Sequence, residues 1–282
     1  MSEQPDTIRD QPRKRPIREL PSAHPLDDDL RQRLTDEFVV FLDYDGTLTP
    51  IVDDPDEARL PERTRATIEA LAAVSLVAVV SGRDLADVRE MVALDGLAYA
   101  GSHGFDILHA DGRHEQLATD HLDALDGAHH DLERRLAEVP GVRIERKRFA
   151  IAVHDRKVTD PELRSQIAEV MAELAAERSE LRLTGGKRIH ELRPDIDWDK
   201  GRAIETLLTE LGAEARVPIY LGDDETDEDG FRAVKAHDGV AVVVRGEDAE
   251  RETAADAALE TTEEAERFLD ELRELATERA AG

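Results

Sequence analysis

Residues 38–50 have the sequence FVVFLDYDGTLTP, a short apolar run that ends in two carboxylates, a glycine and a threonine. The run predicts a strand that is buried on both faces, as in a parallel sheet. Asp43 and Asp45 then lie at the carboxyl end of that strand, where open α/β sheets hold their ligands. Because side chains alternate along a strand, carboxylates two residues apart can converge on one point, and Gly46 lets the chain turn away.

This pair of carboxylates suits a reaction that needs one nucleophile and one acid, held together by a cation. An aspartate can attack phosphorus and form an aspartyl-phosphate, and a second carboxyl group can protonate the leaving oxygen. Mg²⁺ binds through one or two carboxylates together with phosphate oxygens of a substrate. The alternative for the pair alone is an acidic turn on the surface, between a strand and a helix.

The composition bounds the class of protein. The 282 residues suffice for one large domain or for a core with a smaller insertion, and 40% of them are hydrophobic. The absence of cysteine excludes a disulfide framework and thiolate chemistry. No apolar stretch approaches the roughly 20 residues of a membrane span, and the charged N-terminus lacks the apolar segment of a secretory signal. We therefore expect a cytoplasmic protein without a membrane partner.

The formal net charge of −28 argues against nucleic acid as a partner, because a polyanion would be repelled. The same charge would oppose a phosphate-ester substrate unless positive groups gather at the site. Lysines are few, so arginine supplies most of the positive charge. Such a surface is what we expect in a salt-rich cytoplasm, where ions screen self-repulsion.

The order of the expected elements predicts an α/β fold with a doubly wound, Rossmann-like parallel sheet. The expected strands of this sheet, with helices between them, are 38–42, 76–80, 97–100, 217–221 and 240–244. The sequence pattern changes after the third strand, where two amphipathic helices alternate with two strand pairs. The second pair is predicted to turn at Gly185 and Gly186.

These patterns divide the chain into three parts. Residues 37–108 and 193–282 form the core, and residues 109–192 form an inserted α+β cap domain. Residues 1–36 form an N-terminal arm, and a short helix is expected at 27–37. The prolines and charges before residue 26 predict a mobile, partly disordered segment.

Two further polar turns follow apolar runs. GDDETDED at 222–229 places Asp223 at the same sheet edge as the first two aspartates. An EF-hand calcium loop is excluded there, because Gly230 at the sixth position would put Ala236, not glutamate, at the twelfth. In the turn 81–83 (SGR), a hydroxyl and backbone N–H groups make a phosphate cradle, or alternatively a simple helix cap.

In their order, DYDGT, SGR, Lys200 and GDDETD resemble the motifs of the haloacid-dehalogenase-like phosphatases over residues 38–245. More narrowly, the chain is similar to the trehalose-6-phosphate phosphatases in four features: DYDGTLTPI, GSHGF, the Glu145-x-Lys147 spacing and GDDETDED. In that family the insertion is a cap that closes over the sugar. The resemblance implies a Mg²⁺-dependent hydrolysis of trehalose 6-phosphate to trehalose and phosphate through an aspartyl-phosphate. It also implies a trehalose-6-phosphate synthase that works alongside the chain.

The resemblance also implies the roles of the core residues. Asp43 would be the nucleophile and a metal ligand, and Asp45 the general acid that offers its backbone carbonyl to the metal. Asp223 would complete the protein ligands, with Asp224 or Asp227 supporting them. Lys200 would hold the transferring phosphoryl group and offset the charge of the carboxylates.

The residues implied for substrate binding lie in the core turns and on the cap strands. They are Ser81, Gly82, Arg83, His103, Glu145, Lys147, His154, Lys187 and Glu191. For the cap residues the alternative is a solvated strand face with an ion pair, and for His154 a structural histidine. Asp155 stands where the family has an aromatic or small residue, and Trp198 is expected to pack between core and cap.

Two other functions compete with this interpretation. One is a phosphatase for another sugar phosphate, such as a sucrose or mannosylglycerate phosphate. The other is a non-catalytic sugar-phosphate sensor or an accessory subunit of trehalose synthesis. An inactivated relative should have lost one of the core acids or the lysine, and this sequence keeps them all.

Overall fold

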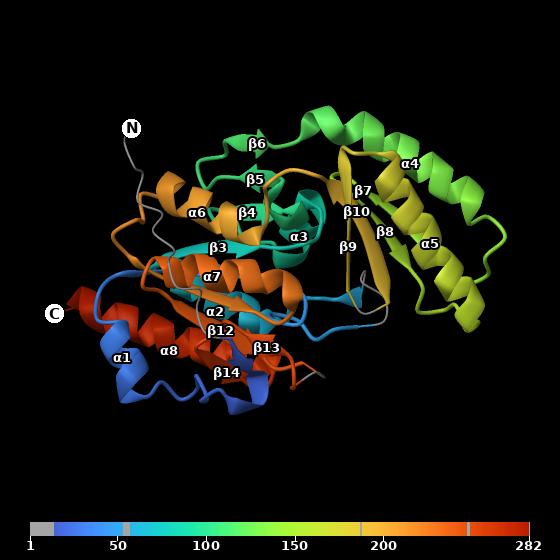
Figure 1. Cartoon of the computed structure of the whole chain (residues 1–282). Coiled ribbons are helices and arrows are strands. Elements are labelled where there is room, and N and C mark those ends of the chain that lie inside the picture. Colours follow the sequence, from blue (N-terminus) through green and yellow to red (C-terminus); the bar gives the residue numbers. More distant parts are fainter. Residues whose placement is uncertain (1–13, 53–56, 187, 247–248, 282) are drawn as a thin grey trace, which may run out of the picture.

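The computed structural model describes residues 14–52, 57–186, 188–246 and 249–281, which form two units with separate sheets (Figure 1). The larger unit holds eight strands in the order β14-β12-β11-β2-β3-β4-β5-β6. They are β2 (Phe38–Leu42), β3 (Leu76–Val80), β4 (Ala98–Gly101), β5 (Asp106–Leu108), β6 (His114–Gln116), β11 (Val217–Gly222), β12 (Val240–Val244) and β14 (Ala257–Leu259). Strands from β14 to β4 are parallel, which confirms the expected doubly wound sheet, whereas β5 and β6 are antiparallel.

Helices cover both faces of this sheet, because side chains of the central strands alternate between two apolar cores. In β2, Phe38 and Val40 pack with one set of helices, and Val39 and Phe41 with the other. The first set is α1 (Asp28–Arg33), α2 (Glu62–Ala72), α3 (Leu85–Val92) and α8 (Thr262–Ala281); the second is α6 (Lys200–Glu210) and α7 (Glu228–Ala236). Within the described ranges, no helix is both long and apolar enough to cross a membrane.

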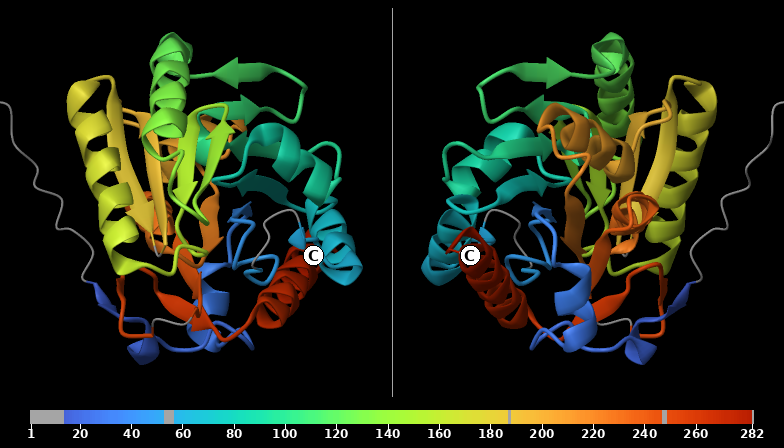
Figure 2. Two further views of the ribbon diagram at one scale, coloured as in Figure 1. Left: turned by 90° about the vertical axis from the view of Figure 1, so that its right-hand side faces the viewer. Right: turned by 90° about the vertical axis from the view of Figure 1, so that its left-hand side faces the viewer.

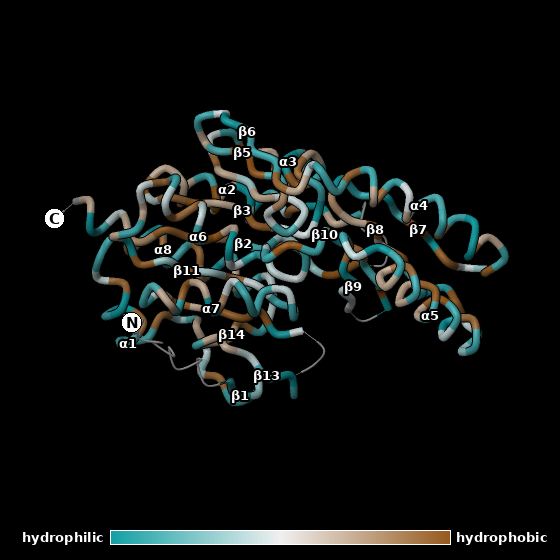
Figure 3. Tube along the Cα trace, turned by 45° about the horizontal axis from the view of Figure 1, so that its top comes forward, coloured by the Kyte–Doolittle hydropathy of each residue, from teal (hydrophilic) through white to brown (hydrophobic). Residues whose placement is uncertain are grey.

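The smaller unit is a four-stranded antiparallel sheet with two helices on one face (Figure 2). Its strand order is β7 (Arg143–Lys147), β8 (Ala150–His154), β10 (Ile189–Pro194), β9 (Leu181–Gly186), and its helices are α4 (Leu122–Arg135) and α5 (Pro161–Glu177). Ile151, Val153 and Leu192 face the helices and form a third apolar core with them. The alternating colours along α5 in Figure 3 reflect its one apolar side. The opposite sheet face carries polar side chains such as Glu145 and Glu191 beside the small Ala152.

The structure differs from the expected cap in two places, at its first residues and at its second strand pair. Residues 114–116, assigned to the cap, form β6, which pairs with β5 at the edge of the large sheet. Their polar sequence (His-Glu-Gln) gave no strand signal, because an edge strand need not be apolar. Gly185 and Gly186 are not the hairpin turn; they lie in β9 and pair with His190 and Ile189.

The expectation of a mobile arm before residue 26 is wrong for its described part, and residues 1–13 lie outside the described ranges. β1 (Arg15–Pro16) pairs with β13 (Glu252–Thr253), and a 3-10 turn follows at Ile17–Glu19. Ile17 and Leu20 are buried in the core under α6 and α7. Scattered apolar side chains therefore anchor this segment despite its prolines. The expected helix after it is present as α1, capped by Asp27.

Candidate active site

Asp43 lies directly after β2 in the middle of the sheet and is 4% exposed. Its backbone N–H donates to the carbonyl of Leu221 on β11 (2.9 Å), which joins the ends of the two strands. Gly46 has a φ of +77°, and a Cβ added there would lie 2.1 Å from an oxygen of Asp223. Glycine is therefore needed at this turn, because it leaves room for the Asp223 carboxylate beside Asp43.

The carboxylates of Asp43, Asp223 and Asp227 form one cluster, in which a ligand oxygen from each lies within 4.8 Å of the others. Lys200, the first residue of α6, is 3% exposed, and its Nζ donates to Asp43 and to Asp227, both at 2.7 Å. Asp199 caps the N-terminus of α6 and so fixes where the helix begins. The start of the helix therefore places the buried ammonium group of Lys200 beside two buried carboxylates.

Burial and charge act against each other in this cluster. Burial raises the pKa of Asp43 well above its ordinary value, although the ammonium group of Lys200 opposes that rise. Burial alone would lower the pKa of Lys200, but the charges of Asp227 and Asp43 outweigh it and raise that pKa. Burial would also raise the pKa of Asp227, yet the charge and hydrogen bond of Lys200 bring it below its ordinary value. The lysine is therefore charged and pairs most firmly with Asp227.

Asp227 also supports the loop after β11. It accepts hydrogen bonds from the backbone N–H groups of Asp223 (2.9 Å) and Asp224 (3.0 Å) and from the hydroxyl of Tyr220. Asp224 is exposed, and its side chain accepts from the N–H of Thr226 at 2.8 Å. Of the two candidates for a supporting role, the geometry therefore favours Asp227.

The donor set of this cluster fits a divalent cation. Three carboxylates (Asp43, Asp223 and Asp227) share one lysine, which leaves an excess of negative charge. Burial raises the pKa of Asp223 well above its ordinary value, and the neighbouring Asp227 and Asp43 raise it further. A divalent cation would neutralise this excess, and a site made only of oxygen donors suits Mg²⁺.

The SGR turn follows β3 directly, and Ser81 is 1% exposed. Its hydroxyl accepts from the N–H of Arg83 (3.2 Å), whereas α3 begins later, with Asp84 at the cap position. The alternative of a simple helix cap at Ser81 is therefore not favoured. Gly82 is required for packing, because a Cβ there would lie 2.6 Å from the ring of His103.

Arg83, implied for substrate binding, is engaged with Asp45 in this structure. Its guanidinium donates to both carboxylate oxygens, at 2.7 and 2.6 Å, and lies over the ring of Tyr44, 5.5 Å from its centroid. A bidentate pair of this kind fixes both distance and direction. Arg83 therefore orients the carboxylate that the resemblance implies as the general acid.

His103 lies between the SGR turn and the smaller unit. Ser102, His103 and Gly104 have φ values of +49°, +58° and +93°, three successive residues in the left-handed region. The turn buries the imidazole, and its Nε2 lies 3.5 Å from an oxygen of Glu191 on β10. Burial, together with the charges of Arg193 and Lys200, lowers the pKa of His103 to about 3. The ring is therefore neutral near pH 7.

Glu191 is the buried acid of the smaller unit, at 4% exposure. It accepts from Lys147 Nζ (3.3 Å) and Arg193 Nε (2.5 Å). Burial would raise the pKa of Glu191, but these two cations and a hydrogen bond from His103 bring it well below its ordinary value. Arg193 was not among the expected site residues; its spacing of two from Glu191 on one strand was the available signal.

Those expected cap residues that the structure describes share one sheet face, the face away from α4 and α5. Glu145 of β7 and Glu191 of β10 both pair in register with Ala152 of the strand between them. Glu145 contacts His154 (3.1 Å), whose hydrogen bond lowers the pKa of Glu145. Lys187 lies outside the described residues. A small alanine between two acids makes this face suited to hold a polar ligand.

The two units also meet at a contact that the sequence did not reveal. Asp84 accepts from the backbone N–H of Arg148, at the β7–β8 turn, through both oxygens (3.1 and 2.9 Å). Phe149 of the same turn stacks on Phe105 of the larger unit, with 5.9 Å between ring centroids. This turn therefore docks beside the SGR motif.

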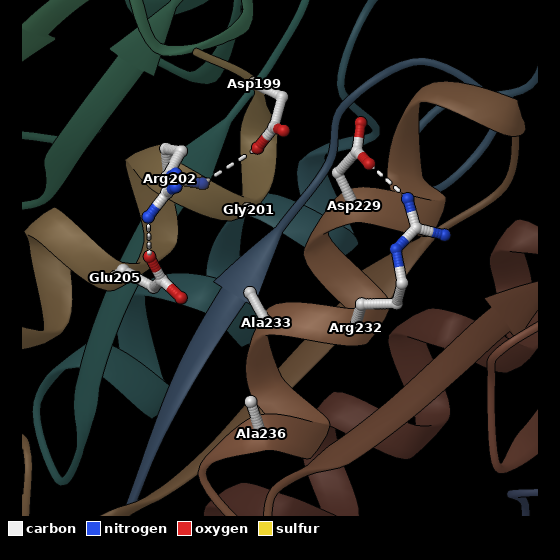
Figure 4. A pocket seen from close by; sticks show the side chains of 8 residues that line it. All are labelled: Asp199, Gly201, Arg202, Glu205, Asp229, Arg232, Ala233 and Ala236. Atoms are coloured by element: carbon white, nitrogen blue, oxygen red, sulfur yellow. Dashed lines mark hydrogen bonds and ion pairs between the residues drawn. The ribbon is translucent and has the colours of Figure 1, made fainter. Parts of the chain in front are cut away.

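The pocket drawn in Figure 4 lies between α6 and α7, and none of the clustered residues Asp43, Lys200, Asp223 and Asp227 lines it. It has a volume of about 200 Å³ and is lined by Asp199, Gly201, Arg202, Glu205, Asp229, Arg232, Ala233 and Ala236. Arg202 pairs with Glu205 (3.4 Å), and Arg232 pairs with Asp229. Because these charges satisfy one another, we assign no ligand to the pocket.

The fold and the site together define a haloacid-dehalogenase-like protein with a cap. Its parallel sheet carries two aspartates after β2 and an acid after β11, a lysine begins α6, and an α+β unit is inserted. The sequence model of the trehalose-phosphatase family matches residues 41–263. The chain therefore belongs to the trehalose-phosphatase family, which confirms the resemblance of its motifs.

Known relatives agree with this assignment. The trehalose-phosphate phosphatase of Mycobacterium marinum is 47% identical over 230 residues, which cover 79% of this chain but only 58% of that protein. A solved trehalose-6-phosphate phosphatase related protein is 28% identical, with a TM-score of 0.70 over 85% of this chain and 99% of that one. The C-terminal domain of the Candida albicans trehalose-6-phosphate phosphatase shares the fold at 24% identity (TM-score 0.76, covering 90% and 98%).

Proposed function

We propose that the chain is a Mg²⁺-dependent phosphatase that hydrolyses trehalose 6-phosphate to trehalose and phosphate. The observation that supports this most is the meeting of two sets of groups at His103, which touches the SGR turn on one side and Glu191 on the other. The first set, around Asp43 and Lys200, suits phosphoryl transfer, and the second suits sugar hydroxyls. In this proposal the chain consumes the product of a trehalose-6-phosphate synthase and works alongside it.

The proposed chemistry has two steps on one aspartate. A carboxylate oxygen of Asp43 attacks phosphorus while the bond from phosphorus to the sugar oxygen breaks, and Asp45 gives its proton to that oxygen. Water then attacks the phosphorus of the aspartyl-phosphate, Asp45 takes a proton from it, and the bond to Asp43 breaks. Lys200 offsets charge at the nucleophile, and the Ser81 turn holds phosphate oxygens.

In this proposal the side chains of Asp43 and Asp223 and the backbone carbonyl of Asp45 would hold the metal. Mg²⁺ bound there would reduce the negative charge on the transferring group. Asp227 would keep the ligand loop in place through the two backbone N–H groups that it binds. On the cap side, Glu191, Lys147, Glu145 and His154 would bind the sugar hydroxyls.

The test is phosphate release from trehalose 6-phosphate, sucrose 6-phosphate, mannosylglycerate phosphate and p-nitrophenyl phosphate, with Mg²⁺ and with EDTA. We expect a strong preference for trehalose 6-phosphate, loss of activity with EDTA and its return with excess Mg²⁺. Activity that survives EDTA would contradict the metal role. Turnover of none of these substrates would favour the sensor instead.

A further inference from the structure

The loop that carries Asp223 is bound from two sides. On the inner side, the N–H groups of Asp223 and Asp224 donate to one oxygen of Asp227 at 2.9 and 3.0 Å. On the outer side, the guanidinium of Arg251 donates to the carbonyl of Asp223 at 2.6 Å and to that of Asp224 at 3.0 Å. Both peptide donors and both peptide acceptors of this two-residue turn therefore have charged partners, which make strong hydrogen bonds.

Arg251 is itself held in place by Glu228, near the start of α7. Its Nη1 lies 3.0 Å from a carboxylate oxygen of Glu228, and the two side chains are only 13% and 7% exposed. The other oxygen of Glu228 accepts from the N–H of Ala254 at 2.9 Å. The charge of the guanidinium is therefore balanced, and its planar group has one orientation.

The backbone of Arg251 is anchored by the N-terminal segment. The N–H of Ile17 donates to the carbonyl of Arg251 at 3.0 Å, and β1 pairs with β13 immediately after it. Ile17 is 1% exposed in the core beneath α6 and α7. A segment far away in the sequence thus supports the arginine that holds the loop after β11.

The position of Asp223 tolerates little movement. Its carboxylate lies against Gly46, where even a Cβ would come within 2.1 Å of it. We infer that Arg251, anchored by residues 15–17, is a positioning residue that holds Asp223 in reach of the metal. This inference rests on the proposed function, because it concerns the proposed metal ligand. It adds a part of the chain that none of the motifs contains.

Charge and geometry predict opposite effects when Arg251 is replaced. Arg251→Met removes a positive charge close to an acidic cluster, which by Coulomb's law alone would strengthen the binding of Mg²⁺. Loss of the two hydrogen bonds to the loop would weaken that binding. Arg251→Lys keeps the charge but lacks the planar fork that reaches two carbonyls and a carboxylate together. Weaker binding in both variants therefore identifies the geometric role.

The experiment titrates MgCl₂ alone into the full chain by isothermal calorimetry at 25 °C, for the wild type, Arg251→Met and Arg251→Lys. Partners that orient metal ligands typically contribute about 10- to 100-fold in affinity, so we expect at least about a tenfold loss in both variants. The control is Arg245→Met, because Arg245 donates to the carbonyl of Leu20 (3.2 Å) in the same N-terminal segment, away from the loop. Its affinity should stay within about twofold of the wild type.

The outcomes separate this inference from the proposed function. Equal Mg²⁺ affinity in the wild type and both Arg251 variants would overturn the inference alone. An equal loss in Arg245→Met would also overturn it, because the effect would then reflect general loosening of the segment. A wild type that binds no Mg²⁺ would overturn the proposed metal site and the inference with it. Melting temperatures confirm folding, and Arg251→Lys decides if Arg251→Met does not fold.

Discussion

Asp43 and Glu191 are both buried carboxylates that contact a lysine, yet their pKa values move in opposite directions. At Asp43 the carboxylates outnumber the cation, and burial raises the pKa. At Glu191 two cations, Arg193 and Lys147, contact one carboxylate, and the pKa of Glu191 falls well below its ordinary value. The site around Asp43, called here the phosphate end because the proposed function places the phosphate there, is thus short of positive charge and suited to gain it from a cation. The site around Glu191, called the sugar end on the same ground, already holds a fixed anion as an acceptor.

The largest effect should come from the phosphate end. Asp43→Asn removes the proposed nucleophile, because a neutral amide does not attack phosphorus, and turnover should fall at least about a thousandfold for every phosphate ester. Phosphate release measures this. Asp197→Asn is the control, since Asp197 is exposed and pairs only with Arg202 at 3.1 Å among its described contacts. A folded Asp43→Asn variant with appreciable turnover would exclude the nucleophile assignment.

A smaller and selective effect should come from the sugar end. Glu191→Gln keeps the shape but loses the charge, so kcat/KM for trehalose 6-phosphate should fall about 10- to 100-fold, the range of a charged hydrogen bond. Hydrolysis of p-nitrophenyl phosphate, which lacks the sugar, should change by less than about threefold. Glu169→Gln, on the exposed side of α5, is the matched control. Equal losses on both substrates would contradict a separate sugar end.

The smallest effect concerns His103, which lies between the two ends. Its pKa of about 3 in the folded protein is below the ordinary 6.5 of the unfolded chain. Below pH 6.5 the unfolded state therefore binds a proton that the folded state does not, and stability falls as pH falls, by about 1.4 kcal/mol per pH unit down to about pH 3. His103→Asn removes this contribution, and asparagine tolerates a positive φ.

Urea unfolding of the wild type and of His103→Asn between pH 7.5 and 4.5 measures the difference. The free energy of unfolding of the variant should depend less steeply on pH, and the gap between the two slopes should open only below pH 6.5. Parallel profiles would mean that the imidazole is protonated in the folded protein as well.

The sequence predicted those parts of the site that local patterns encode. Asp43, Asp45 and Asp223 each follow an apolar strand, so their place at one sheet edge follows from the parallel order alone. Lys200 needed the family resemblance, because it begins a helix, 157 positions after Asp43, and does not follow an apolar strand. The residues on the polar face of the smaller sheet were named through the same resemblance, and their roles in sugar binding stay predictions.

The rest depended on contacts between distant segments, which leave no local signal. Ile17 and Leu20 look like exceptions in a polar, proline-rich stretch, and only the core beneath α6 and α7 explains them. β6 is polar because it is an edge strand. Arg251 lies in an acidic stretch of sequence, and its contacts with two backbone carbonyls and with Glu228 become visible only in the fold.

Trp198, the only tryptophan in the sequence, lies in the short stretch between β10 and α6, two residues before Lys200. Its carbonyl accepts from Arg182 of the smaller unit (2.7 Å), and its indole nitrogen lies 3.0 Å from where a Cβ on Gly104 of the larger unit would be. Its fluorescence therefore comes from one place, the crossing between the two units. Ligand binding that shifts one unit against the other should change this emission, so the chain carries its own optical reporter and needs no attached dye.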